Sequence, residues 1–487
     1  MFIHGQTKPV ALTYPLDRKK PEPQNSWLAD LIYVDGAFQS GLAMFAGPGG
    51  TISRFSRDGA DLAKAHRLAN RAILPGLVNV HSHAFQRAIR GRTEYRTGAE
   101  RDTFWTWREK MYHAANQLSP EALYAVSRMA FLEMLLSGIT TVGEFHYVHH
   151  ALGGTPYQDR NLLAHEVLRA AGEVGLRTAL LRTAYVRSGW QAPANPLQAR
   201  FITPLVEDFI ADTESLRTSI PRLSRPGRAW VGVAPHSIRA VPLDYLTETI
   251  AYARFHKMPV HMHVAEQPAE VQACLGEYGQ RPVALLASKG FLDERFTGIH
   301  GIHIDASEIN ALAAARARIA ACPTTERNLG DGIGPAAELF SAGAGICFGS
   351  DSNAQIDLLE DARSLEYHLR LNRIERVVLA PDCSHDGLAK RLFACATQTG
   401  AESLAAPGGS LQVGKPADFF TIDINDPSIA GAGADALLSV IVFAMERTAI
   451  REVCVDGEFL VREGRHPLQE KITSEFVAVQ QKLWSAQ

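Results

Sequence analysis

The sequence predicts an α/β protein: a (β/α)8 barrel of the TIM type with a small β-sandwich domain formed from both chain termini. Three observations lead to this fold class. Short β-rich runs alternate with helix-like stretches from about residue 77 onward, polar side chains collect at the ends of those runs, and β-rich segments flank them on both sides. Such alternation is typical of parallel strands joined by crossover helices, and eight units over roughly 280 residues fit a barrel.

The expected strands are runs rich in apolar and β-branched residues. They are 77–83, 139–145, 176–185, 229–237, 259–266, 296–303, 318–323 and 344–352. A helix expected over 119–138 has Ser119 as its N-cap, Pro120 at its first position and Gly138 at its end. An open doubly wound sheet would also alternate, but no G-x-G-x-x-G follows the first strand.

The chain of 487 residues is too long for one compact core, so we expect more than one domain. The β-rich segments 28–73 and 409–470 predict one discontinuous β domain, and 74–408 predicts the barrel. Residues 1–27 are expected to form an N-terminal arm, and 471–487 a C-terminal tail or helix.

Composition excludes several classes of function. Basic and acidic residues number 49 and 52, which leaves no strong field for nucleic acid or an anionic membrane. The six cysteines form no C-x-x-C, so neither a cysteine zinc site nor a disulfide framework is expected. Without an apolar stretch typical of a signal peptide or a membrane helix, we expect a soluble, cytoplasmic protein.

Two histidines end the first expected strand. His81 and His83 are two residues apart, so their side chains point to the same face and can converge on one ion. Zinc accepts such nitrogen ligands, although an isolated H-x-H is more often a polar strand end than a ligand pair. Other strand ends carry further candidate groups: His263 with Glu266, His300 with His303, and Asp351.

Each of these groups also has a structural interpretation. Asp351 or Ser352 could cap the next helix, and His261 is expected to face the helix layer of the barrel. A barrel, however, brings the carboxyl ends of all its strands to one rim. The joint occurrence of these side chains therefore favours a metal centre on that rim.

The motifs LPGLVNVHSH, HMHVAE, IHGIH, GSDS and GGSLQVGKPADFFTID, in this order, resemble the amidohydrolase superfamily over nearly the whole chain from residue 74. In its deaminase branch, the resemblance implies one divalent metal ion. The implied metal ligands are His81, His83, His263 and Asp351. Zinc is the expected ion, and the same ligands accept iron or manganese. The fourth strand ends in APHSIRA with no lysine, which favours a single metal over two.

The resemblance also implies catalytic roles. Asp351 would take a proton from the metal-bound water, Glu266 would pass a proton to the substrate nitrogen, and His300 would orient the water and stabilise charge. His303 is expected to be structural. This superfamily often forms dimers, so a homodimer is expected.

The narrower motifs FWTWRE, EFHYVHH and TERNLGDGI resemble the formimidoylglutamate deiminases of that branch. The implied reaction is attack of water on the amidine carbon of N-formimidoyl-L-glutamate, which gives N-formyl-L-glutamate and ammonia in histidine degradation. A dicarboxylate substrate calls for local guanidinium groups, which bind carboxylates bidentately. The expected substrate contacts are Arg108, Arg239, Gln86, Tyr147 and His236, whereas Trp105 and Trp107 are expected to pack.

Two other functions stay open at this stage. A deaminase of the same branch could act on a nucleobase or nucleoside such as guanine, but it would need a pocket for a flat neutral ring. A catalytically inactive scaffold of the same fold is the second alternative. Inactive relatives usually lose metal ligands, whereas every ligand position is filled here.

Overall fold

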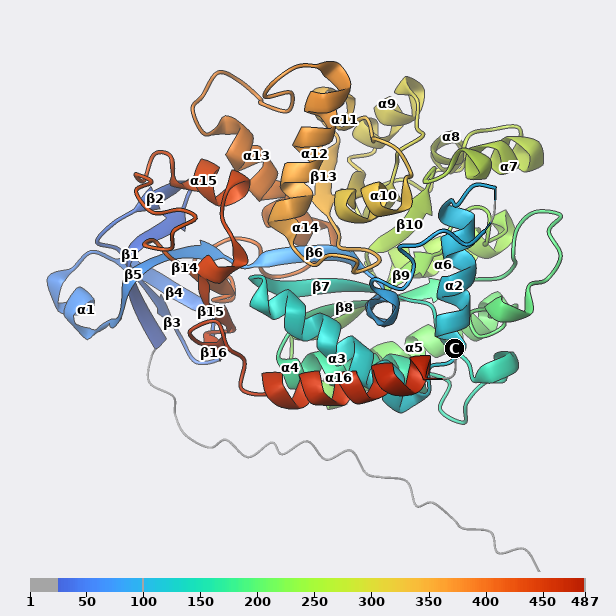
Figure 1. Ribbon diagram of the computed structural model, residues 1–487, viewed down its shortest axis with the longest axis horizontal. Coiled ribbons are helices and arrows are strands. Elements are labelled where there is room, and N and C mark those ends of the chain that lie inside the picture. The colour runs from blue at the N-terminus through green and yellow to red at the C-terminus, as the bar shows by residue number, and fades with distance from the viewer. Residues whose placement is uncertain (1–24, 99, 486–487) are drawn as a thin grey trace, which may run out of the picture.

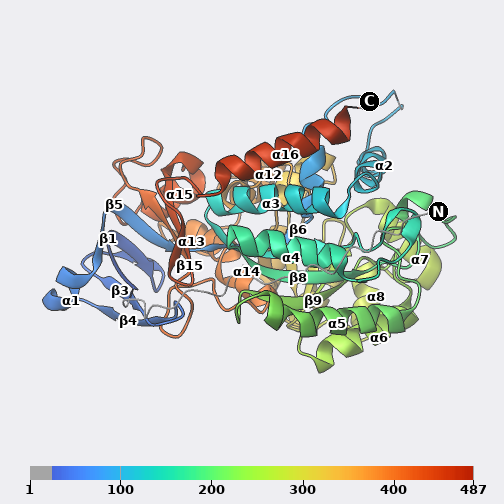
Figure 2. The same ribbon diagram turned by 90° about the horizontal axis from the view of Figure 1, so that it is seen from below.

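The structure is a computed structural model that describes residues 25–98 and 100–485. Residues 1–24, most of the expected N-terminal arm, lie outside the described part. A barrel and a β domain lie side by side, with the β domain at the left of Figure 1. The outer helices of the barrel and the strands of the β domain separate clearly in both views (Figures 1 and 2).

The barrel contains eight parallel strands in sequence order, at the positions expected from the sequence. They are β6 (Leu77–Ser82), β7 (Ile139–His146), β8 (Arg177–Ala184), β9 (Ala229–Pro235), β10 (Val260–Val264), β11 (Phe296–His300), β12 (Arg318–Ala321) and β13 (Gly345–Phe348). Their side chains are almost all buried, as in a parallel sheet that is covered by helices. The predicted TIM-type barrel is confirmed.

The barrel closes where the chain beyond β13 meets the end of β6. The backbone N–H of Asp351 donates to the His81 carbonyl at 2.9 Å, and that of His83 donates to the Asp351 carbonyl at 2.9 Å. Gly349 permits this approach, because a Cβ at that position would lie 2.6 Å from the His81 Cβ. The closing seam thus places three of the predicted metal ligands next to one another.

Helices follow the strands of the barrel, and most of them cover its outside. Ser119 caps α3 by accepting from the Ala122 N–H at 3.2 Å, with Pro120 at the first position, as expected. The helices are α2 (Phe104–Ala115), α3 (Pro120–Leu136), α4 (Leu162–Val174), α5 (Val206–Leu223), α6 (Leu243–Phe255), α7 (Pro268–Tyr278), α8 (Pro282–Ser288), α9 (Ala306–Ala314), α10 (Pro323–Leu329), α11 (Ala336–Ala342), α12 (Leu358–Arg373), α13 (Gly387–Cys395) and α14 (Gln398–Ser403).

The small β domain is built from both ends of the chain, as predicted, and its strands form one mixed sheet. Strand β5 joins the two ends, because it pairs parallel with β1 and antiparallel with β14. The strands are β1 (Asn25–Val34), β2 (Ala37–Gln39), β3 (Ala43–Ala46), β4 (Ile52–Ser56), β5 (His66–Pro75), β14 (Phe419–Asp423), β15 (Ile450–Val455) and β16 (Glu458–Val461). The short helix α1 (Gly59–Lys64) lies between β4 and β5, whereas α15 (Leu437–Phe443), between β14 and β15 in the chain, packs against α12 and α13 of the barrel. Strand β1 therefore includes residues 25–27 of the segment expected as an arm.

The C-terminal segment expected as a tail or helix contains α16 (Gln469–Trp484), which lies along α3 in both views (Figures 1 and 2). Ile472 and Phe476 form its buried face, and Glu475 pairs with Arg128 of α3 at 2.7 Å. None of the helices in the described ranges is both long and apolar enough to cross a membrane.

Candidate active site

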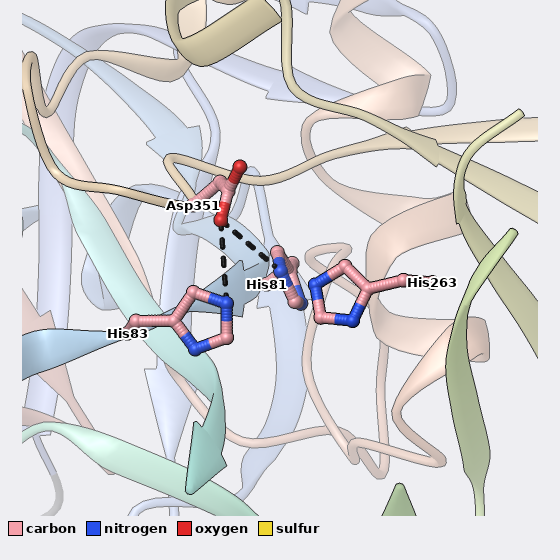
Figure 3. Close-up of side chains that lie close together, drawn as sticks. All are labelled: His81, His83, His263 and Asp351. Carbon is pink, nitrogen blue, oxygen red and sulfur yellow. Dashed lines mark ion pairs between the residues drawn. The ribbon is translucent and has the colours of Figure 1, made fainter. Parts of the chain in front are cut away.

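Four predicted ligands converge at the carboxyl end of the barrel (Figure 3). The potential ligand atoms of His81, His83, His263 and Asp351 all lie within 4.8 Å of one another, and all four side chains are buried. The Asp351 Oδ1 atom lies 3.3 Å from His81 Nε2 and 3.4 Å from His83 Nε2. Residues more than 250 positions apart in the sequence are thus joined into one cluster of donor atoms.

The donor set fits a divalent metal ion. Ligands at about 2.0–2.1 Å from a tetrahedral ion lie about 3.3 Å from one another. The two distances from Asp351 agree with that spacing. Both ring nitrogens of His81 are buried and have no hydrogen-bond partner among the described residues, which is costly unless another group binds there. Burial, together with His83 and His300, holds the pKa of His81 well below its usual range, so a lone pair is available.

Backbone carbonyls orient the other two histidines. His83 Nδ1 lies 2.9 Å from the Phe145 carbonyl oxygen, and His263 Nδ1 lies 3.0 Å from that of His236. A carbonyl accepts only from a protonated nitrogen, so each Nδ1 carries the hydrogen and each Nε2 keeps a free lone pair. This is the tautomer that lets Nε2 bind a metal ion.

Two predicted catalytic groups lie beside the cluster. His300 Nε2 is 3.5 Å from Glu266 Oε1 and 3.7 Å from Asp351 Oδ2. Burial raises the pKa of Glu266 to about 7, against the opposing effect of His300. A carboxyl group with such a pKa can both hold and release a proton near neutral pH, as a general acid or base must.

A buried carboxylate that the sequence analysis missed lies behind His300. Glu326 Oε1 is 3.3 Å from His300 Nδ1 and accepts from the Cys322 N–H at 2.8 Å. Burial opposes a charge on His300, but Glu266, Glu326 and Asp351 outweigh it and raise the pKa of His300 to about 10. The motif TERNLGDGI contains Glu326, but its spacing from His300 gives no hint of contact.

A pocket opens onto the cluster. It brings together all five of the expected substrate contacts with the catalytic groups. The predicted residues in its wall are Gln86, Arg108, Tyr147, His236, Arg239, His83, His263, Glu266, His300 and Asp351. The wall also contains residues that the sequence analysis missed, among them Tyr112, Tyr185 and Glu270. Tyr185 follows β8 and could have been found as a polar residue at the end of an expected strand.

The two arginines of the pocket differ in their contacts. Arg108 packs over the Trp105 ring at 4.4 Å, and its Nε and Nη1 atoms are buried without a partner in the described part of the chain. Arg239 donates from Nη1 to the Ser188 carbonyl at 3.1 Å. Gln86 Nε2 donates to the Tyr147 hydroxyl at 3.0 Å. The pocket therefore combines positive charge at Arg108 and Arg239 with unused hydrogen-bond donors.

Two further histidines have structural contacts. His261 Nε2 lies 3.0 Å from the carbonyl of Ser403 in α14, so this residue faces the helix layer as expected. His303 Nε2 lies 3.0 Å from the carbonyl of Asp331, outside the metal cluster. Neither imidazole belongs to the group of four potential ligands.

Comparisons with known proteins agree with this fold and site. Residues 72–460 match the amidohydrolase family. The formimidoylglutamate deiminase of Pseudomonas aeruginosa is 39% identical over 427 residues, which cover 87% of this chain and 92% of that protein. A 5-methylthioadenosine/S-adenosylhomocysteine deaminase of Natronomonas pharaonis is 28% identical, over 80% of this chain and 81% of that one.

A solved structure supports the same relationship. The crystal structure of an amidohydrolase from Brucella melitensis superimposes with a TM-score of 0.86 at 34% sequence identity. The match covers 94% of this chain and all of that one. The resemblance predicted from the motifs is confirmed: the chain belongs to the amidohydrolase family, and it is a hydrolase.

Proposed function

We propose that this enzyme hydrolyses N-formimidoyl-L-glutamate to N-formyl-L-glutamate and ammonia, a step of histidine degradation. One observation carries the proposal: a single pocket joins the His/Asp cluster to two guanidinium groups, Arg108 and Arg239. The unpaired buried nitrogens of Arg108 call for an anionic partner, and a carboxylate is the group that a guanidinium fork binds best. The identity of 39% to the Pseudomonas aeruginosa deiminase supports the same substrate.

The charges of the pocket suit the two ends of this substrate. Its two carboxylates match the guanidinium groups, while its amidine, a cation near neutral pH, matches the carboxylates Glu266, Glu270 and Asp351 of the same pocket wall. A flat neutral nucleobase would bring no negative charge to Arg239, and it would leave the buried nitrogens of Arg108 without a partner among the described residues. Burying an unpaired charge costs several-fold more free energy than burying an unpaired neutral donor.

We propose that one divalent cation, zinc, binds to His81, His83, His263 and Asp351. When bound, such an ion lowers the pKa of a water molecule towards neutrality and makes it nucleophilic. The histidine-rich donor set, which zinc accepts readily, supports this choice of ion. Iron or manganese would use the same ligands.

Different side chains around the reacting carbon accept the proton of the water, donate a proton to the leaving nitrogen and stabilise the developing charge. Asp351 accepts the proton of the attacking water at its carboxylate, and Glu266 delivers a proton to the terminal nitrogen of the amidine. His300 donates from Nε2 to the attacking oxygen and stabilises its charge. A C–O bond forms at the amidine carbon and the C–N bond to the terminal nitrogen breaks, so that ammonia leaves and the formyl amide remains.

Product analysis tests this proposal. The purified metal-loaded enzyme is incubated with N-formimidoyl-L-glutamate, ammonia is measured by a coupled assay, and the carbon product is identified by proton NMR. We expect one ammonia and one N-formyl-L-glutamate per substrate consumed. Release of formamide with free glutamate would contradict the proposed position of bond cleavage. The cytoplasmic location and the homodimer stay predictions, which cell fractionation and light scattering would test.

A further inference from the structure

One wall of the pocket holds two tyrosines that meet at a single glutamine. Tyr112 belongs to α2, Tyr185 follows β8, and Gln198 ends the short 3-10 helix η3 (Pro196–Gln198). All three are buried, with at most 2% of each residue exposed. Gln198 Nε2 lies 2.7 Å from the hydroxyl of Tyr112 and 2.7 Å from that of Tyr185. Both tyrosines line the same pocket as Arg108 and Arg239.

Ser188 sets the direction of these hydrogen bonds. Its Oγ accepts from the Asn195 N–H at 3.0 Å, so its proton is free to go to Gln198 Oε1 at 2.5 Å. The amide oxygen of Gln198 therefore faces Ser188, and the amide nitrogen faces the two tyrosines. Since an amide nitrogen has two protons to donate, it can serve both phenolic oxygens at once.

Both tyrosine hydroxyls are consequently acceptors towards Gln198 and keep their own protons. Their oxygens are 3.4 Å apart, so the hydrogen bond between them, in which either hydroxyl can be the donor, is long and weak, and a closer acceptor can take its proton. Burial raises the pKa of Tyr112 well above its usual range, which keeps that hydroxyl protonated. Each hydroxyl thus has a proton to donate to a third group in the pocket.

The same serine also fixes the neighbouring guanidinium. The carbonyl oxygen of Ser188 accepts from Arg239 Nη1 at 3.1 Å. Ser188 therefore positions Gln198 through its hydroxyl and Arg239 through its backbone. The hydroxyl pair and the guanidinium belong to one hydrogen-bonded unit, and each of these groups has a donor to offer to the pocket.

A ligand group that uses these donors must be an acceptor, and a carboxylate, which has no protons of its own, is such a group. We propose that Tyr112 and Tyr185, oriented by Gln198, are specificity-determining donors to one carboxylate of the substrate. This inference rests on the proposed function, since it assigns one end of the dicarboxylate to these hydroxyls. Tyr112 and Tyr185 touch the ligand, and Gln198 is a positioning residue.

Binding of a simple dicarboxylate tests the donor pair without any reaction. Tyr112→Phe, Tyr185→Phe and Gln198→Leu are compared with wild type for glutarate affinity by calorimetry. The control is Tyr245→Phe, because Tyr245 is a buried tyrosine whose hydroxyl donates to the Thr203 carbonyl at 3.2 Å, outside the pocket wall. A lost hydrogen bond to a charged group predicts a Kd about 10- to 100-fold higher in each tyrosine variant. The control is expected to bind as wild type does. Wild-type affinity in both tyrosine variants would overturn the inference.

Kinetics with shortened substrates then locate the contact. The substrates are N-formimidoyl-L-glutamate and two analogues that each lack one carboxylate, N-formimidoyl-4-aminobutyrate and N-formimidoyl-2-aminobutyrate. We expect the tyrosine variants to raise KM with kcat within about threefold, and their effect to disappear for one analogue and persist for the other. Gln198→Leu should follow the same pattern although it touches no substrate. An equal loss on all three substrates would overturn the inference.

The two proposals fail in distinguishable ways. An enzyme that binds glutarate through the tyrosines but releases no ammonia from N-formimidoyl-L-glutamate would refute the proposed reaction and support the donor pair. An enzyme that turns over the amidine with unaltered KM in both tyrosine variants would support the proposed reaction and refute the donor pair.

Discussion

Replacing Arg108 by methionine tests whether this arginine binds the substrate or stabilises the fold. Methionine keeps much of the aliphatic volume that packs over Trp105 and removes two buried nitrogens that lack partners among the described residues. Leaving buried donors of a charged group unpaired costs about 1–3 kcal/mol, and this cost disappears in the variant. The lost cation–π contacts, 4.4 Å from Trp105 and 5.4 Å from Tyr112, offset it by about 0.5–2 kcal/mol.

We therefore expect the free energy of unfolding of Arg108→Met to stay within about 2 kcal/mol of the wild-type value, or to rise. Loss of a desolvated charge pair with substrate costs about 2–5 kcal/mol, so kcat/KM should fall by about 30- to 5,000-fold. Denaturant unfolding and steady-state ammonia release measure the two quantities. Arg101→Met, an exposed arginine just before the same helix, is the control and should change neither. Strong destabilisation of Arg108→Met with little change in kcat/KM would refute the reasoning.

Three further predictions concern the metal cluster, proton transfer and acid stability. Asp351→Asn should lower the metal content per chain, measured by elemental analysis, and abolish ammonia release; full metal occupancy in this variant would contradict the ligand set. Glu266→Gln should lower kcat by about 10²- to 10⁴-fold while the metal content stays at the wild-type value, because a general acid–base group is removed and no ligand is lost. Burial lowers the pKa of His146 to about 3. Because this pKa is lower in the folded state than in the unfolded state, the unfolded state binds the proton first as the pH falls. The free energy of unfolding therefore keeps its full value above about pH 6.5 and decreases below it. Between pH 6.5 and 4.5 the free energy of unfolding should fall by about 2–3 kcal/mol more in wild type than in His146→Asn. Urea unfolding of both proteins at both pH values measures this difference. An equal decrease in the two proteins would contradict the prediction.

Much of the site could be predicted because its residues stand at strand ends. Each barrel strand is a local pattern, and the closure of a barrel brings all the carboxyl ends together, so His81, His263 and Asp351 could be placed on one rim without any coordinates. One β domain built from both termini could also be expected, because β-rich segments flank the barrel on either side, and the pairing of β5 with β14 joins them.

The missed residues are those whose contacts depend on the paths of loops. Gln198 lies in a connection after β8, and nothing in its local sequence indicates that it meets Tyr112 of a different unit. Glu326 reaches His300 because α10 begins directly after β12, a geometry that the motif alone does not specify. Long-range contacts of this kind arise from tertiary packing, whereas periodicity reports the local structure alone.

The most direct test of the central claim compares kcat/KM for amidine and nucleoside substrates. The zinc-loaded enzyme is assayed for ammonia release from N-formimidoyl-L-glutamate, N-formimidoyl-L-aspartate, guanine, cytosine and 5′-methylthioadenosine under identical conditions. A dicarboxylate pocket with two guanidinium groups predicts that N-formimidoyl-L-glutamate has the highest kcat/KM, at least about 10³-fold above any nucleobase or nucleoside. A nucleobase or nucleoside that is turned over faster than both amidines would contradict the claim.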